Sequence, residues 1–282
     1  MQPYKSTSEI HIKGAAAGDD DDDGELRRRA ALREAFGDSS ESDPDEPAVC
    51  AGPPRSRGAG AGREQWRWEA VAGVRGLWLC AAFLSADEQS RLLTAIRREG
   101  WFCDAQNQAM RFGDLPSWII ELSSLIHEAI CVGDVNVGSG VELENEDEDA
   151  CPLPSDLLWR EPLFDQLIAN RYEPGEGICA HVDLMRFDDG IAIVSLESPC
   201  VMHFSRTEQE VAVCDAPKTQ DESTKIPVYL NPGSLVVMSG DARYLWKHEI
   251  NRKPGAQHWG GRELEQQIRT SITLRKLLAS PN

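Results

Sequence analysis

Two histidines and one aspartate in this sequence have the side chains and the spacing to hold a metal ion. His181 and Asp183 are separated by one residue in a segment that is typical of a β-strand. Residues i and i+2 of a strand point to the same face, so the imidazole and the carboxylate can reach one point in space. His248 lies in a later predicted strand and is the candidate for a third ligand.

Two histidines and a carboxylate on one side of a metal leave three coordination positions open. This arrangement is typical of non-haem Fe(II) oxygenases, whereas a structural zinc site is closed by four ligands, usually with cysteine. The eight cysteines are scattered, and none has metal-ligand spacing. A His-x-Asp pair also occurs by chance, and a lone histidine is more often a hydrogen-bonded structural residue. The interpretation therefore depends on the residues that follow His248.

The segment Arg269–Arg275 follows, and it places two guanidinium groups on one face of a predicted strand. That face holds Arg269, Ser271, Thr273 and Arg275, and the other holds Thr270, Ile272 and Leu274. An inward-facing arginine needs a compensating anion, and its planar fork grips carboxylates through two hydrogen bonds. A dicarboxylate cosubstrate with one end on the metal would supply that anion to Arg269. In isolation, an exposed edge strand would be the better interpretation, but the preceding His-x-Asp pair and His248 favour the inward orientation.

Several further side chains are weighed as parts of the site. Asn170 and Tyr172 share one strand face and could offer an amide and a phenol to the cosubstrate, although Tyr172 is equally well explained by packing. Tyr244 and Trp246 are expected to share the strand face of His248, either walling off the site or packing in the core. His203 is interpreted as a strand-surface residue in preference to a pocket residue, and His258 as a loop residue.

Short strands separated by Pro-Gly and Gly turns are predicted to position these side chains. They are Ile168–Tyr172, Ala180–Asp183, Ile191–Leu196, Val201–Phe204, Ile226–Leu230, Leu235–Met238, Arg243–Glu249 and Arg269–Leu274. About eight such strands indicate a closed barrel or a two-sheet jelly roll. We therefore expect an α+β fold, mainly β, with N-terminal helices that support one outer face.

The N-terminal part of this fold is predicted to begin near Trp66, with a strand over Leu77–Leu79. Ser85 and Glu88 have the spacing of a capping box at the start of a helix. That helix is expected to end at Gly100, and a second helix to begin near Pro116.

The chain is predicted to divide into a tail, residues 1–64, and one domain, residues 65–282. The tail is rich in Asp, Ser, Gly and Pro with few large apolar residues, so we expect it to be disordered. It is interpreted either as a regulatory or targeting segment or as a solvated extension. Residues 133–156 and 205–225 are predicted to be surface loops.

Charge and composition limit the partners. The tail carries nine Lys/Arg and fourteen Asp/Glu, giving 9 − 14 = −5, and residues 65–282 carry 20 − 33 = −13. This acidity does not favour general nucleic-acid binding, although residues 240–282 hold eight Lys/Arg against four Asp/Glu. Scattered cysteines, no apolar signal segment and no long apolar run predict a protein of the cytoplasm or nucleus, away from membranes. We also expect a monomer.

In the order N-x-Y (170–172), H-x-D (181–183), a distant His (248) and R-x5-R (269–275), the sequence resembles the AlkB-type Fe(II)- and 2-oxoglutarate-dependent dioxygenases. The stretches NRYEPGEGICAHVD and SLVVMSGDARYLWKHEI are most similar to AlkB homologues that hydroxylate wobble uridines in tRNA. The resemblance covers roughly residues 75–278 and implies the oxygenase domain alone, with a double-stranded β-helix fold.

The resemblance also implies the roles of individual residues. His181, Asp183 and His248 would bind Fe(II), while Asn170, Tyr172, Arg269 and Arg275 would line the 2-oxoglutarate pocket. Consumption of O2 and 2-oxoglutarate would yield succinate and CO2 and hydroxylate a C–H bond, and a hydroxylated N-methyl group would leave as formaldehyde. A lid over the target base would correspond to Gln106–Gly113, where Asp114 follows in place of the family's frequent tyrosine.

Three functions are compatible with these expectations. The first is oxidation or demethylation of a nucleobase, in RNA such as tRNA. The second is hydroxylation or demethylation of a protein side chain, because an acidic domain attracts basic peptides. The third is a catalytically silent binding or scaffold protein with the same fold. The presence of the three candidate ligands and both arginines argues against it.

Overall fold

A computed structural model of the protein describes residues 65–102, 106–136, 151–207, 225–253 and 255–278. Ala61–Asn282 form one compact unit. Its first strand, β1 (Arg67–Ala70), begins next to Trp66, where the sequence places the start of the fold. The predicted tail lies outside the described residues, as do 137–150 and 208–224 of the two predicted loops. Each helix within the described ranges is too short or too polar to cross a bilayer.

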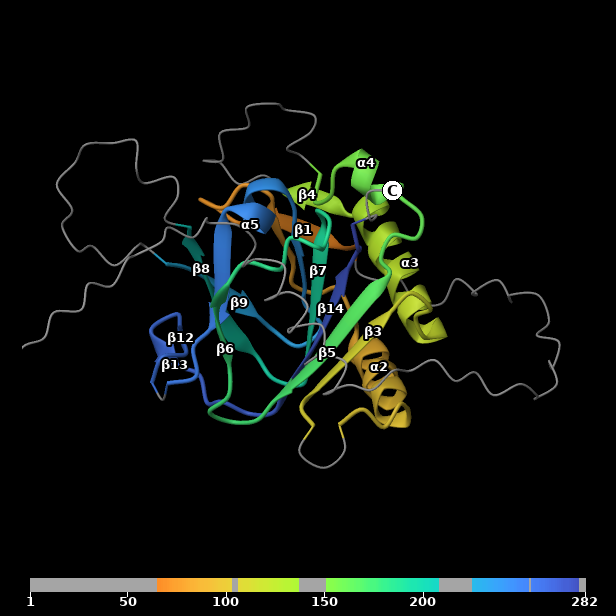
Figure 1. Cartoon of the computed structure of the whole chain (residues 1–282). Helices are drawn as coiled ribbons and strands as arrows, with labels where there is room; N and C mark the ends of the chain where they lie inside the picture. Colours follow the sequence, from red (N-terminus) through yellow and green to blue (C-terminus); the bar gives the residue numbers. More distant parts are fainter. Residues whose placement is uncertain (1–64, 103–105, 137–150, 208–224, 254, 279–282) are drawn as a thin grey trace, which may run out of the picture. The chain divides into compact units, whose positions relative to one another are not determined.

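Strands form most of the described structure and build two sheets (Figure 1). In spatial order the larger sheet consists of β3 (Gln108–Phe112), β5 (Gln166–Tyr172), β14 (Arg269–Arg275), β7 (Ile191–Leu196), β10 (Leu235–Met238), β2 (Leu77–Cys80), β1 and β4 (Asp134–Asn136). The smaller sheet consists of β6 (Ile178–His181), β11 (Trp246–Ile250), β8 (Cys200–Arg206) and β9 (Ile226–Leu230). Apart from the β1–β4 pair, neighbouring strands in these sheets are antiparallel.

The inner strands of the larger sheet are buried on both faces, and β7 shows how. Ile191 and Ile193 join the core that contains Met202 of the smaller sheet, while Ala192 and Val194 join the core under the helices. Alternating side chains of one strand therefore fill two different cores, which is why its sequence is continuously apolar instead of alternating. The two sheets pack through their inner faces, and the predicted jelly roll is confirmed.

Two helices cover the outer face of the larger sheet. In α2 (Ala86–Arg98), Ser85 accepts a hydrogen bond from the Glu88 amide and the Glu88 carboxylate accepts one from the Ser85 amide, so the predicted capping box is confirmed. The second helix, α3 (Ser117–Val132), begins immediately after Pro116 and buries one side of its surface in the helix-side core. Both helices lie beside β3 and β5 in Figure 1.

One glycine allows β6 to lie against β11. A Cβ atom on Gly177 would stand 2.2 Å from the backbone oxygen of Ile250, so a larger residue would force the two segments apart. Ile178 then pairs with Ile250, and His181 pairs with His248 three residues further along β6. The turn after β5 therefore sets the register that brings the two histidines together.

Four sequence expectations need correction. The strand predicted over Arg243–Glu249 is wrong at its start, because the short helix α5 (Gly240–Tyr244) precedes β11. Tyr244 consequently lies in that helix and is exposed, and it does not share the strand face of His248. The strand predicted over Ala180–Asp183 ends at His181. The predicted loop at His258 contains instead the hairpin of β12 (His258–Trp259) and β13 (Arg262–Glu263). Sequence reasoning also missed β1, β3, β4 and α4 (Ser155–Leu158).

Candidate metal and carboxylate site

The side chains of His181, Asp183 and His248 meet at one point between β6 and β11. One ligand-type atom from each of the three lies within 4.8 Å of the others. His248 Nε2 is 3.7 Å from Asp183 Oδ2, and the two imidazole rings have centroids 4.3 Å apart. Among the described residues this is the one such group of three. The donors are two nitrogens and a carboxylate, a set suited to iron and lacking a thiolate.

The aspartate is held from the larger sheet. Arg275, on β14, donates a short hydrogen bond from Nη1 to Asp183 Oδ1, and its Nε donates to Gln166 Oε1 at 2.6 Å. Burial opposes ionisation of Asp183, but the interactions with His248 and Arg275 outweigh it and hold its pKa below the ordinary value. The carboxylate is therefore ionised and available as an anionic ligand at neutral pH.

Both histidines can present a free nitrogen. His181 Nδ1 lies 2.8 Å from the backbone oxygen of Cys179, which can only accept, so in the neutral imidazole Nδ1 carries the proton and Nε2 has the lone pair. Burial lowers the pKa of His248 to about 4, although the Asp183 carboxylate acts in the opposite direction. A neutral imidazole is the form that binds metals.

A buried arginine lies on the same sheet as Arg275. Arg269 is only 4% exposed, and its Nε donates to Ser195 Oγ at 3.0 Å. Its Nη1 and Nη2 are buried with no hydrogen-bond partner in the described part of the chain. Its guanidinium stands over the ring of Tyr172, whose pKa is raised by burial. A buried guanidinium with two idle nitrogens is costly, so the geometry fits a carboxylate bound in the bidentate manner.

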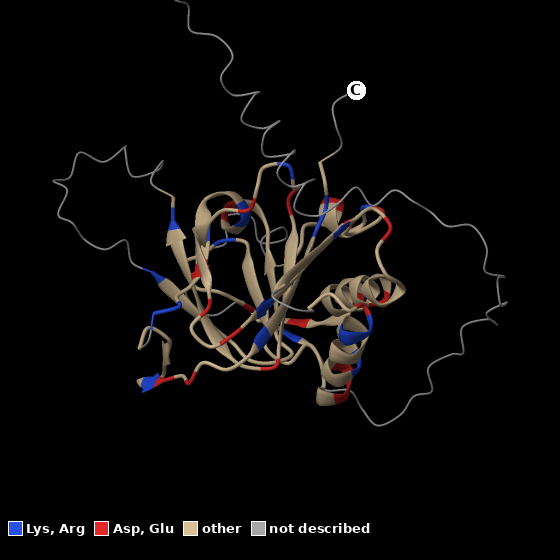
Figure 2. Cartoon of the chain, turned by 60° about the horizontal axis from the view of Figure 1, so that its bottom comes forward, with Lys and Arg blue, Asp and Glu red and all other residues tan. Residues whose placement is uncertain are grey.

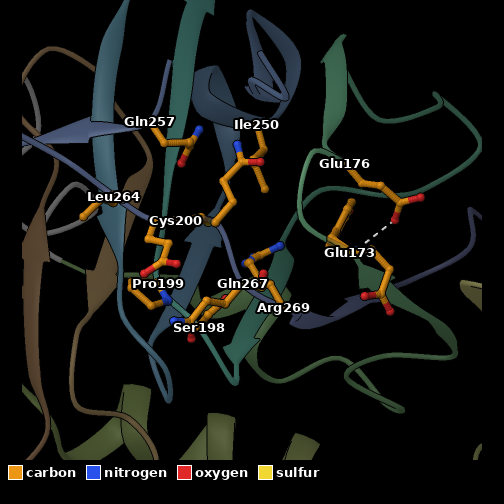
Figure 3. A pocket seen from close by; sticks show the side chains of 13 residues that line it. Glu173, Glu176, Ser198, Pro199, Cys200, Ile250, Gln257, Leu264, Gln267 and Arg269 are labelled. Carbon is orange, nitrogen blue, oxygen red and sulfur yellow. Dashed lines mark hydrogen bonds between the residues drawn. The ribbon is translucent and has the colours of Figure 1, made fainter. Parts of the chain in front are cut away.

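A cavity surrounds Arg269 (Figure 3). Tyr172, Ser198, Pro199, Cys200, Ile250 and Gln257 are among its lining residues. The thiol of Cys200 is buried there, and burial raises its pKa; Glu173, Glu176 and Glu265 also line the cavity. β14 lies at the centre of the larger sheet and is buried along its whole length, which rules out the exposed edge strand as the alternative for this segment.

A second cleft, of about 260 Å³, opens between β5 and the start of β6. Its polar lining includes Asn107, Gln108, Asn170, Arg171 and Arg252. Gln108 Nε2 donates to Asn170 Oδ1 at 2.6 Å, so the amide considered for the cosubstrate is engaged by β3. The segment expected to act as a lid, Gln106–Gly113, forms this edge strand and the residues on either side of it.

The other weighed residues lie outside the metal group. Trp246 is buried in the core between the sheets, and His203 is half-buried on β8. Burial lowers the pKa of His203, and its Nδ1 has no partner among the described residues. Sequence reasoning missed Ser195, whose place opposite Ser271 on β14 follows from strand pairing, and Gln166 and Arg243, for which no local signal exists.

A comparison with protein families matches residues 110–275 to the 2OG-Fe(II) oxygenase superfamily. Among curated proteins, the alkylated DNA repair protein ALKBH8 homolog of Arabidopsis thaliana is 28% identical over 222 residues. The tRNA (carboxymethyluridine(34)-5-O)-methyltransferase ALKBH8 of Macaca fascicularis is 30% identical over 237 residues. These matches cover 74% and 73% of this chain but only 60% and 31% of the two relatives. The chain thus spans less than two thirds of either one.

A third relative, the mitochondrial alpha-ketoglutarate-dependent dioxygenase alkB homolog 7 of Bos taurus, is 34% identical over 106 residues, which are 37% of this chain and 42% of that protein. Among solved structures, OsALKBH1 aligns with 72% of this chain and 97% of its own, with 14% identity and a TM-score of 0.45.

Proposed function

The chain belongs to the 2OG-Fe(II) oxygenase superfamily, and from this premise we propose that His181, Asp183 and His248 hold its Fe(II) and that Arg269 anchors 2-oxoglutarate. It is an AlkB-type dioxygenase that uses Fe(II), 2-oxoglutarate and O2. The residue assignment depends chiefly on Arg269, whose two terminal nitrogens are buried without a hydrogen-bond partner among the described residues. The same strand carries Arg275, which binds Asp183. Bound Fe(II) supplies the activation of O2 that couples oxidation of the cosubstrate to that of the substrate.

The protein's own residues would orient the cosubstrate and the metal ligands and shield them from water. Arg269 would grip the distal carboxylate of the cosubstrate, with Ser195 fixing the guanidinium through Nε. Tyr172 would pack beneath that guanidinium and keep water away from the ion pair. Arg275 would hold the Asp183 carboxylate in one orientation, so that its other oxygen faces the metal. The hydrogen bond from His181 Nδ1 to the Cys179 carbonyl fixes the imidazole in the same way.

We propose a nucleobase, in RNA, as the substrate. The names of the Arabidopsis and macaque relatives refer to alkylated DNA repair and to a tRNA uridine, and both are consistent with a base as the target. The polar cleft beside β5 offers amides and guanidiniums, which are the groups that bind base edges and phosphates. A target base would lie over this cleft with its modified group turned toward the metal.

A protein side chain is the second candidate, and the charge of residues 65–282 favours it. That part of the chain carries 20 − 33 = −13. In the view of Figure 2, basic residues (blue) and acidic residues (red) are both spread along the described elements. Basic peptides would be attracted to such a surface, whereas nucleic acid depends on a local exception to it.

One experiment separates these substrates. The full chain, with Fe(II), 2-oxoglutarate and ascorbate, is incubated with methylated or uridine-modified oligoribonucleotides and, in parallel, with methylated basic peptides. Mass spectrometry follows loss of methyl groups or gain of oxygen, and succinate is measured in the same samples. We expect mass changes in the oligoribonucleotides only, and changes confined to peptides would overturn the RNA proposal.

Variants at the metal group provide the control for that experiment. His181→Ala and Asp183→Ala should abolish succinate formation while the thermal transition of the domain remains cooperative. A silent binding protein would instead form no succinate in the wild type. Full turnover by either variant would remove that residue from the proposed ligand set. Residence in the cytoplasm or nucleus and a monomeric state remain predictions from the sequence.

A further inference from the structure

Arg243 is a fully buried cation close to the metal group. It is 1% exposed and lies in α5, five residues before His248. Its guanidinium donates three hydrogen bonds to backbone oxygens: Nη1 to Asp183 at 3.0 Å, and Nη2 to Leu184 and Phe187 at 2.9 Å each. These acceptors are neutral, and within the described ranges no carboxylate lies at ion-pair distance from Arg243.

Of the three residues that receive these bonds, Asp183 has the least other backbone support, whereas the Leu184 oxygen also accepts from the Phe187 amide and Phe187 forms a β-bridge with Leu277. β6 ends at His181, so Asp183 lies outside the strand ladder. No backbone–backbone hydrogen bond among the described residues involves Asp183, and the next two side chains, Leu184 and Met185, are 54% and 60% exposed. A metal ligand on such a segment would have a variable position unless another group fixes its backbone. In this structure the fixing group is the Arg243 guanidinium.

Arg243 also acts on the aspartate through a second route. It holds the backbone oxygen of Phe187, and the ring of Phe187 lies 4.0 Å beneath the guanidinium carbon of Arg275. Arg275 in turn binds the Asp183 carboxylate. Arg243 therefore holds the backbone of Asp183 directly. It also holds Phe187, whose ring packs against Arg275, the partner of the Asp183 carboxylate. Since α5 leads directly into β11, the same residue ties this segment to the strand that carries His248.

We propose that Arg243 is a positioning residue that fixes Asp183 relative to His248 and so sets the affinity of the site for its metal. This inference rests on the proposed assignment of the ligands. Outer groups that orient metal ligands commonly change metal affinity by about 10- to 100-fold when they are removed. Arg243 would act in this manner through backbone carbonyls, without touching the metal.

A second arginine supplies the matched control. Arg160 also donates to backbone oxygens, from Nε to Leu163 at 2.9 Å, from Nη1 to Asp189 at 2.6 Å and from Nη2 to Gly190 at 3.1 Å. It fixes the loop that follows the Asp183–Phe187 segment but bonds to no residue of that segment. Loss of either arginine should lower thermal stability, whereas only loss of Arg243 should loosen the metal.

The test uses Mn(II) as the probe, with no substrate and no turnover. Free Mn(II) is measured by electron paramagnetic resonance while the metal is titrated into the full-length wild type, Arg243→Met, Arg243→Lys, Arg160→Met and Arg160→Lys. Thermal melts in EDTA are recorded in parallel, and binding is measured well below each transition. We expect the Mn(II) dissociation constant to rise at least about 10-fold in Arg243→Met. The dissociation constant of Arg243→Lys should rise less, and those of both Arg160 variants should stay within about 2-fold of the wild-type value.

Each outcome supports or overturns the proposal. A dissociation constant in Arg243→Met within about 2-fold of the wild type, or an equal rise in the Arg160 variants, would reduce Arg243 to a stabiliser of the fold. If Arg243→Met does not fold, the comparison of Arg243→Lys with Arg160→Lys answers the same question. Failure of the wild type to bind Mn(II), or unchanged binding in His181→Ala, would instead refute the ligand assignment itself.

Discussion

Arg269 shows how much one side chain can define a ligand. Its Nε is occupied by Ser195, and its ring partner Tyr172 closes one face of the guanidinium. Only the two terminal nitrogens remain, buried and without partners among the described residues. They form a planar fork that matches the two oxygens of a carboxylate. At the scale of the residue, this geometry fits an anion with two parallel acceptors and supports the proposed role of Arg269.

Replacing this arginine should affect the cosubstrate before it affects the fold. Arg269→Ala is expected to raise the KM for 2-oxoglutarate by at least about 100-fold, because two charged hydrogen bonds of about 1.5–3 kcal/mol each are lost. The measurement is succinate formation against cosubstrate concentration. Ser195→Ala, which leaves both terminal nitrogens in place, should raise KM by less than about 10-fold. An unchanged KM in Arg269→Ala would contradict its role.

A second residue-scale prediction concerns pH. Burial lowers the pKa of His248 to about 4 in the folded, metal-free protein, while the unfolded chain has the ordinary value near 6.5. The unfolded state therefore binds the proton more readily. The stability from a neutral His248 is complete above about pH 6.5 and is lost as the pH falls toward 4.

The check is a series of thermal melts in EDTA between pH 7.5 and 4.5. His248→Gln should show a flatter dependence than the wild type over this range, and His258→Gln, an exposed histidine in β12, should follow the wild type. Equal slopes in wild type and His248→Gln would contradict the shifted pKa of His248.

At the scale of the element, short apolar strands bounded by turns are predictable. The ends of β7, β9 and β10 coincide with the predicted Ile191–Leu196, Ile226–Leu230 and Leu235–Met238. The edge strand β3 was missed because it is short and largely exposed, without a regular apolar pattern. Arg243 and Tyr244, the last two residues of α5, were interpreted as strand because the helical turn depends on distant contacts. In these contacts the Gly240 amide donates to the Asp189 carboxylate, and Arg243 donates to three backbone carbonyls. No local sequence pattern predicts them.

The capping box of α2 gives an element-scale prediction. Ser85→Ala removes the hydroxyl that accepts from the Glu88 amide, and this should cost about 1 kcal/mol of folding free energy. For a domain of this size, the melting temperature should fall by about 2–4 °C. Ser90→Ala, at an exposed position inside the same helix, is the control and should cause little loss. Equal effects of the two substitutions would mean that the cap contributes nothing.

At the scale of the whole molecule, the order of the candidate site residues along the chain could be read from the sequence, but their partners could not. Strand alternation predicts that Arg269 and Arg275 share a face, and the structure has both facing inward. It does not predict that Arg275 binds Asp183 or that Gln108 engages Asn170, because those pairs join segments far apart in sequence. Such contacts depend on how the sheets cross.

The division of the chain leads to a whole-molecule prediction. Since Ala61–Asn282 form a compact unit, a chain that begins at Gln65 should fold by itself. We expect its melting temperature to lie within about 2 °C of the full chain and its Mn(II) affinity to be unchanged. A large loss of either would show that the first 64 residues contribute to the domain.

The strand that carries His181 is less protected than the strand that carries the two arginines. β14 is paired on both sides within the larger sheet, whereas β6 is the four-residue edge of the smaller sheet and, among the described strands, pairs with β11 alone. Local opening should therefore begin at β6. The metal would then be lost while β14, which carries Arg269, stays folded. Amide hydrogen exchange should be faster in residues 178–181 than in 269–275, and Mn(II) should slow the former most. Equal protection of the two strands without metal would show that the site opens only when the whole domain unfolds.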